Sequence, residues 1–446
     1  EPGRMTLHHH DAIALSRRNL LRSTVLLGAG AAIGTLPFGS QLAHAASSVG
    51  FEARWPKVTA MLEKYVSRQS VAGMVAALGW GDKDPGFIVR GKEAFDDPDD
   101  VGESSLFRAY SQTKPVTGMA AMMLIDDRKL KLDQPVADFI PEFANMQVAI
   151  DPKNSLESRP AKNQITIRHL LTHTAGLGYS GVGKDKVSAE LLRLGVTPAV
   201  LSRMKIPGMP VSPPTPGPDE FVKLAATVPL VSEPGTEWHY SMSLDVLGVV
   251  IQRASGAKSF EAFLQERMFD PIGMKSSYFQ VPASEVHRLT GNYGLMGGFP
   301  IPIDPGKSSI YLDRPAFAFG GSGLVCSPAD YDRFLKMIAN AGMVGTKRVM
   351  GAAAVALGTS NLLPDGVETK GTFIEGAGNG AGGRSGMGRD AGTYGWGGAA
   401  GTVGFVNTRL GLRAGVYTQY MPSEALPIHA EFPVTVLADL AAMRGA

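Results

Sequence analysis

A serine and a lysine three residues apart, Ser111 and Lys114, are the residues of this chain best placed to do chemistry. On a helix this spacing puts both side chains on one face, where a neutral lysine amine can accept the proton of the serine hydroxyl. A helix that begins at or near Ser111 also favours an oxyanion, because its first amides are unpaired and its dipole end is positive. The pair therefore indicates nucleophilic catalysis.

The residues that follow predict the helix that this chemistry needs. Pro115 suits a first turn, because proline lacks the N–H that an interior turn requires. Apolar residues then recur at helical spacing along one buried face: Val116, Met119, Ala120, Met123 and Leu124. Ser-x-x-Lys often arises by chance, so a helix-capping serine followed by a solvated lysine is the alternative. The rest of the chain has to supply partners.

Tyr240 lies at a predicted corner between a turn and a helix. The turn spans 234–243, and the apolar spacing that follows predicts a helix over 244–256. A tyrosine at such a corner can serve core packing alone, which is the alternative to a catalytic role.

The elements that must position these residues alternate between helices and strands. Helical spacing predicts helices over 51–68, 329–341 and 432–444. Turn signals and β-branched residues predict strands over 71–80, 87–90, 394–407 and 412–419. A terminal helix and a hairpin before the Ser111 helix indicate an α/β layout with an antiparallel sheet.

Two patterns suggest cofactor sites but lack the required context. His169 and His173 are four residues apart, where Thr166 is predicted to cap a short helix that stops at Gly176. No Glu or third ligand follows at a useful spacing, so packing and hydrogen bonding are favoured over a metal site. The glycine-rich stretch 376–388 fits G-x-G-x-x-G, but no helix pattern follows it, which argues against dinucleotide binding.

Residues 180–218 differ from the rest of the chain because six prolines fall between 207 and 218, after a short helical piece over 189–204. Such a segment forms neither a regular sheet nor a long helix. We interpret it as an insertion near the site that governs chain-length preference, and a passive surface loop is an equal alternative.

Residues 1–45 are predicted to be a twin-arginine signal. Arg17 and Arg18 precede a moderate apolar run over 24–38, and Ala43-His44-Ala45 supplies a cleavage pattern. The run is shorter than the roughly 20 residues that a bilayer core needs, which disfavours a membrane anchor. We therefore expect a periplasmic or secreted chain, residues 46–446, without stable membrane association.

Composition narrows the function classes further. A formal net charge of +2 over 446 residues gives no support for binding nucleic acid or a membrane surface. A hydrophobic content of 44% allows a large core. The single cysteine, Cys326, excludes an intrachain disulfide and a Cys-based zinc cluster.

Taken together, Ser111, Lys114, Tyr240 and the strand around Trp396-Gly397-Gly398 resemble, in order and spacing, the motifs of the serine β-lactamase and penicillin-binding fold. Segments 165–177, 234–248 and 320–328 are similar to those of class C β-lactamase-related hydrolases, above all family VIII carboxylesterases. The resemblance runs from 51 to the C-terminus. It implies an α/β (α+β sandwich) fold, in which helices flank an antiparallel sheet beside an all-helical region.

By this resemblance, Ser111 is the nucleophile of an acyl-enzyme mechanism, and Lys114 and Tyr240 handle its proton. Which of the two is the base stays open. The backbone amides of Ser111 and Ala399 form the oxyanion hole. No metal or organic cofactor is implied. The residues expected to contact substrate are Trp396, Gly397, Gly398 and Met242.

Two departures from the lactamase pattern bear on the substrate. Trp396 stands where lactamases carry a cation for the substrate carboxylate, and it offers an apolar face and one N–H donor. Met242 lies where lactamases place an asparagine, which removes an amide from the acyl-binding edge. Such a site favours neutral esters over carboxylate-bearing lactams. The lipase pattern G-x-S-x-G is absent, which argues against an α/β-hydrolase.

The first hypothesis is thus a periplasmic serine hydrolase of carboxylic esters, with weak β-lactam hydrolysis as a side activity. The alternatives are a β-lactamase or D-amino-acid peptidase, and a non-catalytic module that binds cell-wall peptides or β-lactams. The expected partner is a small-molecule ester or amide. The natural substrate, the acyl chain length, the balance between ester, lactam and peptide hydrolysis, the oligomeric state and the cleavage of the signal stay open.

Overall fold

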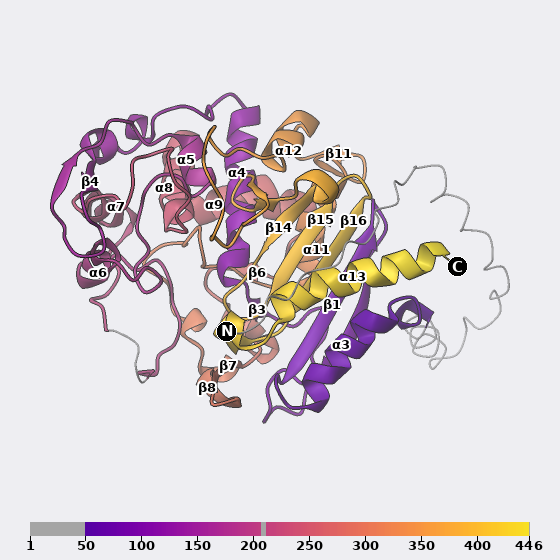
Figure 1. Cartoon of the computed structure of the whole chain (residues 1–446). Coiled ribbons are helices and arrows are strands. Elements are labelled where there is room, and N and C mark those ends of the chain that lie inside the picture. Colours follow the sequence, from indigo (N-terminus) through magenta and orange to yellow (C-terminus); the bar gives the residue numbers. More distant parts are fainter. Residues whose placement is uncertain (1–49, 207–210, 446) are drawn as a thin grey trace, which may run out of the picture. The chain divides into compact units, whose positions relative to one another are not determined.

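Strands from both ends of the chain form a seven-stranded antiparallel sheet (Figure 1). The computed structural model describes residues 50–206 and 211–445, so the predicted export signal lies outside the described residues. β1 pairs with β16, which joins the amino-terminal hairpin to the carboxyl-terminal strands. The order is β12 (Gly378–Asn379), β13 (Arg384–Ser385), β14 (Thr393–Gly397), β15 (Val403–Asn407), β16 (Leu412–Tyr417), β1 (Gly73–Trp80) and β2 (Gly86–Gly91).

Two terminal helices cover one face of this sheet, α3 (Pro56–Ser67) and α13 (Ile428–Gly445) (Figure 1). Side chains of a strand alternate between its two faces, and β1 is buried on both. One set packs under α3 and α13: Met74, Ala76 and Leu78. The other set, Val75 and Ala77, belongs to the larger core on the opposite face.

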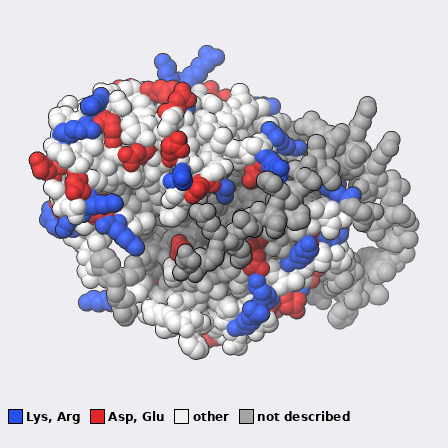
Figure 2. Space-filling view, in the orientation of Figure 1, with Lys and Arg blue, Asp and Glu red and all other residues white. Residues whose placement is uncertain are grey.

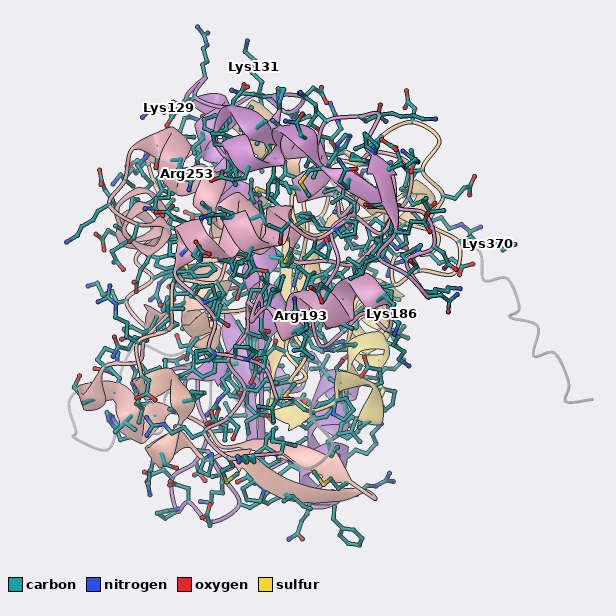
Figure 3. The ribbon with its side chains drawn as sticks, turned by 90° about the vertical axis from the view of Figure 1, so that its left-hand side faces the viewer. Lys129, Lys131, Lys186, Arg193, Arg253 and Lys370 are labelled. Carbon is teal, nitrogen blue, oxygen red and sulfur yellow. The ribbon has the colours of Figure 1, made fainter. Side chains whose placement is uncertain are left out.

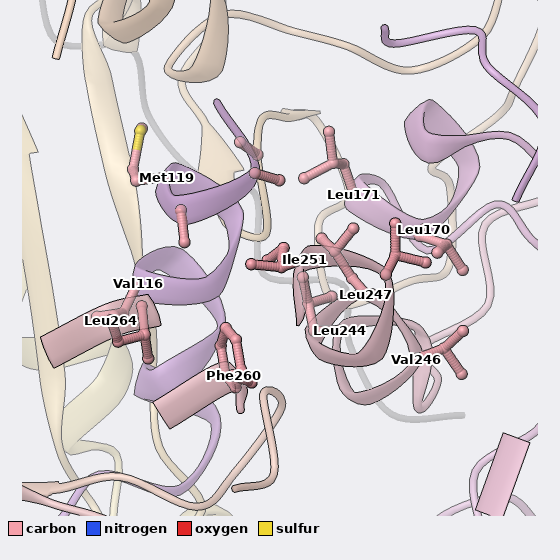
Figure 4. Close-up of a cluster of buried hydrophobic side chains, with 14 of the residues drawn as sticks. Val116, Met119, Leu170, Leu171, Leu244, Val246, Leu247, Ile251, Phe260 and Leu264 are labelled. Carbon is pink, nitrogen blue, oxygen red and sulfur yellow. The ribbon is translucent and has the colours of Figure 1, made fainter. Parts of the chain in front are cut away.

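The opposite face carries α11 (Pro328–Ala339) and the helical region built around α4 (Thr113–Asp126). α4 packs against α8 (Ser243–Ser255) and α12 (Ala352–Gly358), and α5 (Ile167–Leu171) also packs on α8. Figure 4 shows Leu244, Leu247 and Ile251 of α8 between α4 and Leu170 of α5, and Val116 of α4 beside Leu264. Residues 113–124 are all buried, so the predicted single buried face was wrong: other elements surround this helix.

The remaining elements are short and connect these layers. The other helices are α6 (Lys186–Arg193), α7 (Pro218–Ala226), α9 (Phe260–Leu264), the π-helix η4 (Gln265–Phe269) and α10 (Asp270–Ile272). Short 3₁₀ turns are η1 (Tyr110–Gln112), η2 (Val136–Asp138), η3 (Pro141–Asn145), η5 (Ala283–Arg288), η6 (Gly306–Ser308), η7 (Ile310–Leu312), η8 (Gly388–Asp390) and η9 (Ser423–Ala425).

Four small sheets complete the described structure. β3 (Phe107–Arg108), β9 (Val325–Cys326) and β6 (Ser277–Tyr278) form one, and β17 (Tyr420–Met421), β7 (Asn292–Met296) and β8 (Phe299–Asp304) form another. The two hairpins are β4 (Gln147–Ala149) with β5 (Ser158–Pro160), and β10 (Met343–Val344) with β11 (Lys347–Arg348).

Several elements differ in their bounds from the sequence-based expectations. The strand predicted over 394–407 is two strands, because the chain turns back at 398–402, where Gly401 has a φ of +91°. The stretch 376–388 forms the edge strands β12 and β13. The Thr166-capped helix ends at Leu171 rather than at Gly176, and the helix predicted over 189–204 is α6, which ends at Arg193.

The proline-rich insertion, where the structure describes it, is held by side-chain hydrogen bonds. Within the insertion the Ser180 hydroxyl donates to the Val196 carbonyl, and the Ser322 hydroxyl, from outside it, donates to the Pro198 carbonyl, each over 2.6 Å. Residues 207–210 lie outside the described part. Pro198 thus contacts the segment around Gly321, which borders the predicted nucleophile.

The surface carries charges of both signs. On the face shown in Figure 2, Lys and Arg side chains lie among Asp and Glu. In Figure 3, basic side chains such as Lys129, Lys186 and Arg253 come from different elements and are spread over the helical region. Among the described residues, none of the helices combines the length and apolar content that spanning a bilayer requires.

Replacing Gly118 by alanine should destabilise the fold, although alanine is the better helix former. A Cβ atom at Gly118 would lie 1.9 Å from the carbonyl oxygen of Ala381, so one of the two backbones would have to move. We expect a loss of about 1–3 kcal/mol in the free energy of unfolding, measured by urea denaturation.

Gly102→Ala is the control for this variant, because a Cβ atom at Gly102 would have nothing within 4 Å. We expect it to stay within about 0.5 kcal/mol of the wild type. Equal losses in the two variants would contradict the packing argument.

Candidate active site

Ser111 lies in the turn η1, between strand β3 and helix α4. The residue before it, Tyr110, has a φ of +44°, a left-handed conformation that costs a non-glycine residue about 1–3 kcal/mol. The buried Tyr110 ring packs edge-on against Tyr311, with ring centroids 6.3 Å apart. Core packing therefore holds a strained backbone at the position that presents the Ser111 hydroxyl.

A buried ion pair anchors the strand that leads into this turn. Arg108 and Asp304 are both buried, and their side chains lie 2.6 Å apart. The same guanidinium donates to the Thr290 carbonyl and to Gln419 Oε1. The two buried charges compensate each other and have further hydrogen-bond partners. The ion pair therefore connects β3 to the β7–β8 hairpin.

Lys114 is fully buried beside the Ser111 hydroxyl. Its Nζ lies 3.0 Å from Ser111 Oγ and donates to the Gly321 carbonyl over 2.8 Å. The ammonium also lies over the rings of Tyr240 and Tyr179, 4.6 Å and 5.4 Å from their centroids. The structure therefore excludes the solvated lysine that was the alternative interpretation.

Tyr240 reaches the same hydroxyl from the corner before α8. Its hydroxyl donates to Ser111 Oγ over 2.6 Å, and the Trp396 indole N–H donates to the Tyr240 oxygen over 3.3 Å. The Tyr240 ring also stacks on Trp238, with centroids 6.1 Å apart. The tyrosine is thus packed, as the alternative expected, but its oxygen also contacts the serine.

The turn after β14 lies against the backbone just before Ser111. A Cβ atom at Gly398 would be 2.2 Å from the Ala109 carbonyl oxygen, and the Thr402 hydroxyl donates to that oxygen. At Gly397 a Cβ atom would be 3.0 Å from the His429 ring. Ala399 lies half-buried in this turn, so its amide is near the segment that carries Ser111, and its oxyanion role stays a prediction.

The family model described as Beta-lactamase matches residues 58–433. The chain belongs to the β-lactamase family. Esterase EstB of Burkholderia gladioli is 31% identical over 337 residues, which cover 70% of this chain and 76% of that protein. Protein Rv1367c of Mycobacterium tuberculosis is 34% identical over 262 residues, which cover 58% of this chain and only 60% of that protein.

Solved structures share the fold of this β-lactamase family member. The structure titled "EstCE1, a hydrolase with promiscuous acyltransferase activity" superposes with a TM-score of 0.67 at 22% sequence identity, covering 86% of this chain and 99% of that chain. Together with the antiparallel sheet flanked by helices, this match confirms the predicted fold class.

The predicted contact between Met242 and substrate disagrees with the burial of this side chain. Met242 is fully buried in the hydrophobic core beside α8, and its amide donates to the Gly178 carbonyl. Met242 is the residue just before α8, and its side chain packs in the hydrophobic core. The missing lactamase asparagine is replaced here by a packing residue.

The two histidines of the 165–177 segment have separate protein partners. His169 Nδ1 accepts from the Thr166 amide in a capping box, and burial lowers the pKa of His169 to about 4. His173 lies beyond the end of α5, where its Nδ1 accepts from the Ser241 amide. Burial, and then the charge of Lys114, hold the pKa of His173 well below its usual value. The structure favours packing and hydrogen bonding over a shared metal.

A buried aspartate that the sequence analysis overlooked borders Lys114. Asp245, on the first turn of α8, is fully buried, and its Oδ1 accepts from the Gly321 amide over 2.7 Å. The Gly321 peptide therefore joins Asp245 to Lys114, since its carbonyl accepts from the lysine. Burial raises the pKa of Asp245 to about 7, against the opposing effect of the Lys114 charge. In the sequence, this residue could have been found as the one acidic side chain inside the apolar run 244–251.

Replacing Trp396 by phenylalanine should slow phosphonylation of Ser111 by a fluorophosphonate probe. The variant keeps an aromatic ring but loses the N–H that donates to the Tyr240 oxygen. We expect the second-order labelling rate to fall about tenfold, the usual worth of a hydrogen bond to a group that gains charge.

Trp80→Phe is the matched control, because Trp80 stacks on Trp55 at a centroid distance of 5.2 Å and lies on β1. Its labelling rate should equal that of the wild type. An unchanged rate in the Trp396 variant would show that the indole N–H does not assist Tyr240.

Replacing Asp245 by asparagine should stabilise the protein more at pH 8 than at pH 5. The folded-state pKa of Asp245 is raised, so the folded state keeps a proton that the unfolded state has lost, and wild-type stability falls as pH rises toward 7. Asparagine does not titrate. We expect its advantage in the free energy of unfolding to grow by about 2 kcal/mol between these pH values, measured by urea denaturation. An advantage independent of pH would contradict this assignment.

Proposed function

We propose that this protein is a serine carboxylesterase that cleaves carboxylic esters through an acyl-enzyme on Ser111. One observation carries the proposal: Ser111 Oγ lies within hydrogen-bond distance of both Lys114 Nζ, at 3.0 Å, and Tyr240 Oη, at 2.6 Å. A hydroxyl held between two proton-handling groups is the arrangement of an activated nucleophile.

The proposed reaction has two half-reactions. Ser111 Oγ attacks the ester carbonyl carbon while its proton passes to Lys114 or Tyr240, and the same pair then protonates the departing alkoxide. The C–O bond to the alcohol breaks and the acyl group stays on the serine. Water then repeats the attack, releases the acid and returns the proton to Ser111. Which of the two residues is the base stays open.

The amides of Ser111 and Ala399 are proposed to bind the oxyanion of each tetrahedral intermediate. The close approach of Gly398 to the Ala109 backbone supports this assignment, because it brings the turn that holds Ala399 toward the nucleophile. Backbone donors that are fixed before the reaction stabilise developing charge without reorganisation.

Neutral esters are proposed as better substrates than carboxylate-bearing lactams, which leaves β-lactam hydrolysis as a weak side activity. Trp396 supports this preference, because its N–H is engaged with Tyr240 and its ring offers no positive charge for a carboxylate. The names of the relatives agree, since the Burkholderia protein is called an esterase and EstCE1 a hydrolase.

Export to the periplasm or the medium is part of the proposal. It rests on the pattern of residues 1–45, with Arg17 and Arg18 before a moderate apolar run and Ala43-His44-Ala45 after it. The proposed reaction requires no binding partner other than a small-molecule ester or amide substrate.

Hydrolysis of p-nitrophenyl butyrate should depend on Ser111. We expect Ser111→Ala to lower kcat/KM at least about 1,000-fold, because the acyl-enzyme cannot form. A chromogenic cephalosporin should be turned over far more slowly than the ester. Mass spectrometry of the wild type after acid quenching should show a butyryl adduct on Ser111.

Ser284→Ala, a change at an exposed serine, is the control and should keep full activity. Cephalosporin turnover that exceeds ester turnover would replace the proposal by a lactamase or peptidase. Ligand binding without turnover would indicate a binding module.

A further inference from the structure

A large apolar side chain, Phe373, is exposed directly beside the proposed catalytic tyrosine. Its side chain is 66% exposed. The Phe373 ring meets Tyr240 nearly edge-on, with centroids 5.5 Å apart and planes at 75°, and it meets Trp238 at 6.2 Å. An exposed phenylalanine in aromatic contact with an active-site residue is available to a ligand.

The loop that carries Phe373 is built to hold it in this position. The Thr372 hydroxyl accepts from the Ile374 amide, and the Glu375 carboxylate accepts from the Gly371 amide. Ile374 is fully buried, so it anchors the loop in the core while its neighbour projects outward. In Figure 3, Lys370 of the same loop lies at the outer edge of the molecule. The phenylalanine is therefore fixed by its neighbours.

Trp396 extends the same aromatic surface along Tyr240. Its ring centroid is 5.8 Å from that of Tyr240, and its side chain is half-buried. Phe373 and Trp396 thus both contact Tyr240, whose hydroxyl reaches Ser111 over 2.6 Å. We call the pair of Phe373 and Trp396 the aromatic wall.

The aromatic wall lies on the side of the site that handles the leaving group. In the proposed reaction the departing alkoxide takes its proton from Tyr240 or Lys114. Lys114 Nζ lies 4.6 Å from the Tyr240 ring centroid, so either donor brings the alcohol portion of the ester close to Tyr240. The surface that this portion meets is aromatic and apolar. Burying an aromatic group there would cover Phe373 and add ring–ring contacts.

We propose that the aromatic wall binds the alcohol portion of the substrate, and that preferred substrates are esters of aromatic or bulky apolar alcohols. This inference rests on the proposed ester hydrolysis. It assigns Phe373 a role in specificity that acts in acylation, because the alcohol has left before the acyl-enzyme is hydrolysed.

The test compares three esters: ethyl butyrate, benzyl butyrate and ethyl phenylacetate. The first two form the same acyl-enzyme and differ only in the alcohol, whereas the third carries its ring on the acyl side. Wild type should prefer benzyl over ethyl butyrate in kcat/KM. Phe373→Ala should reduce that ratio about fivefold, the typical worth of one aromatic contact, and Phe373→Leu should reduce it less.

Phe299→Ala is the matched control, because Phe299 is 75% exposed and lies on the β7–β8 hairpin. It should leave the ratio unchanged. Fluorophosphonate labelling of each variant checks that Ser111 remains reactive.

Three results would overturn the inference while leaving ester hydrolysis intact: an unchanged benzyl-to-ethyl ratio in Phe373→Ala, an equal loss in Phe299→Ala, or a selective loss on ethyl phenylacetate, which would place Phe373 on the acyl side. Absence of turnover with every ester in the wild type would instead refute the proposed function itself.

Discussion

The burial of the Lys114 amine is the constraint on which the site depends. Lys114 has no exposed surface, so its amine has to find its partners inside the protein. The Gly321 carbonyl and the Ser111 hydroxyl accept its hydrogen bonds, and the Tyr240 ring lies within 4.6 Å of it. An unpaired buried polar group costs about 1–3 kcal/mol. The groups that contact the lysine amine therefore also hold Ser111 in place.

Glycines allow the segments around Lys114 to pack closely against each other. A Cβ atom at Gly382 would lie 2.4 Å from the Lys114 carbonyl, and one at Gly320 would lie 2.4 Å from the Leu244 carbonyl. The turn between β12 and β13 thus lies directly against the backbone of α4. The segment before Gly321 lies in the same way against the backbone of α8. The glycine-rich stretch that fits G-x-G-x-x-G packs an edge hairpin onto the central helix.

The sequence predicted the elements that carry strong periodicity and the residues that stand in fixed motifs. Ser111, Lys114 and Tyr240 were selected together because their order matches one fold, and the structure brings their polar atoms into contact. The burial of Met242 was not evident from the sequence, because a motif position does not reveal which way a side chain points. Phe373 lay in a loop without periodicity, so its contact with Tyr240 depends on folding that no local pattern encodes.

The tight turn after β14 restricts how this protein can diversify. A Cβ atom at Gly398 would lie 2.2 Å from the Ala109 carbonyl oxygen, so a side chain there would displace the main chain, whereas a Cβ atom at Gly397 would meet the His429 ring at 3.0 Å. Position 396 already carries a large side chain beside Tyr240, so a substitution there adds no Cβ atom to this turn. A substitution at position 396 would therefore change the surface beside Tyr240 in one evolutionary step, while the backbone of the turn passes unchanged to descendants.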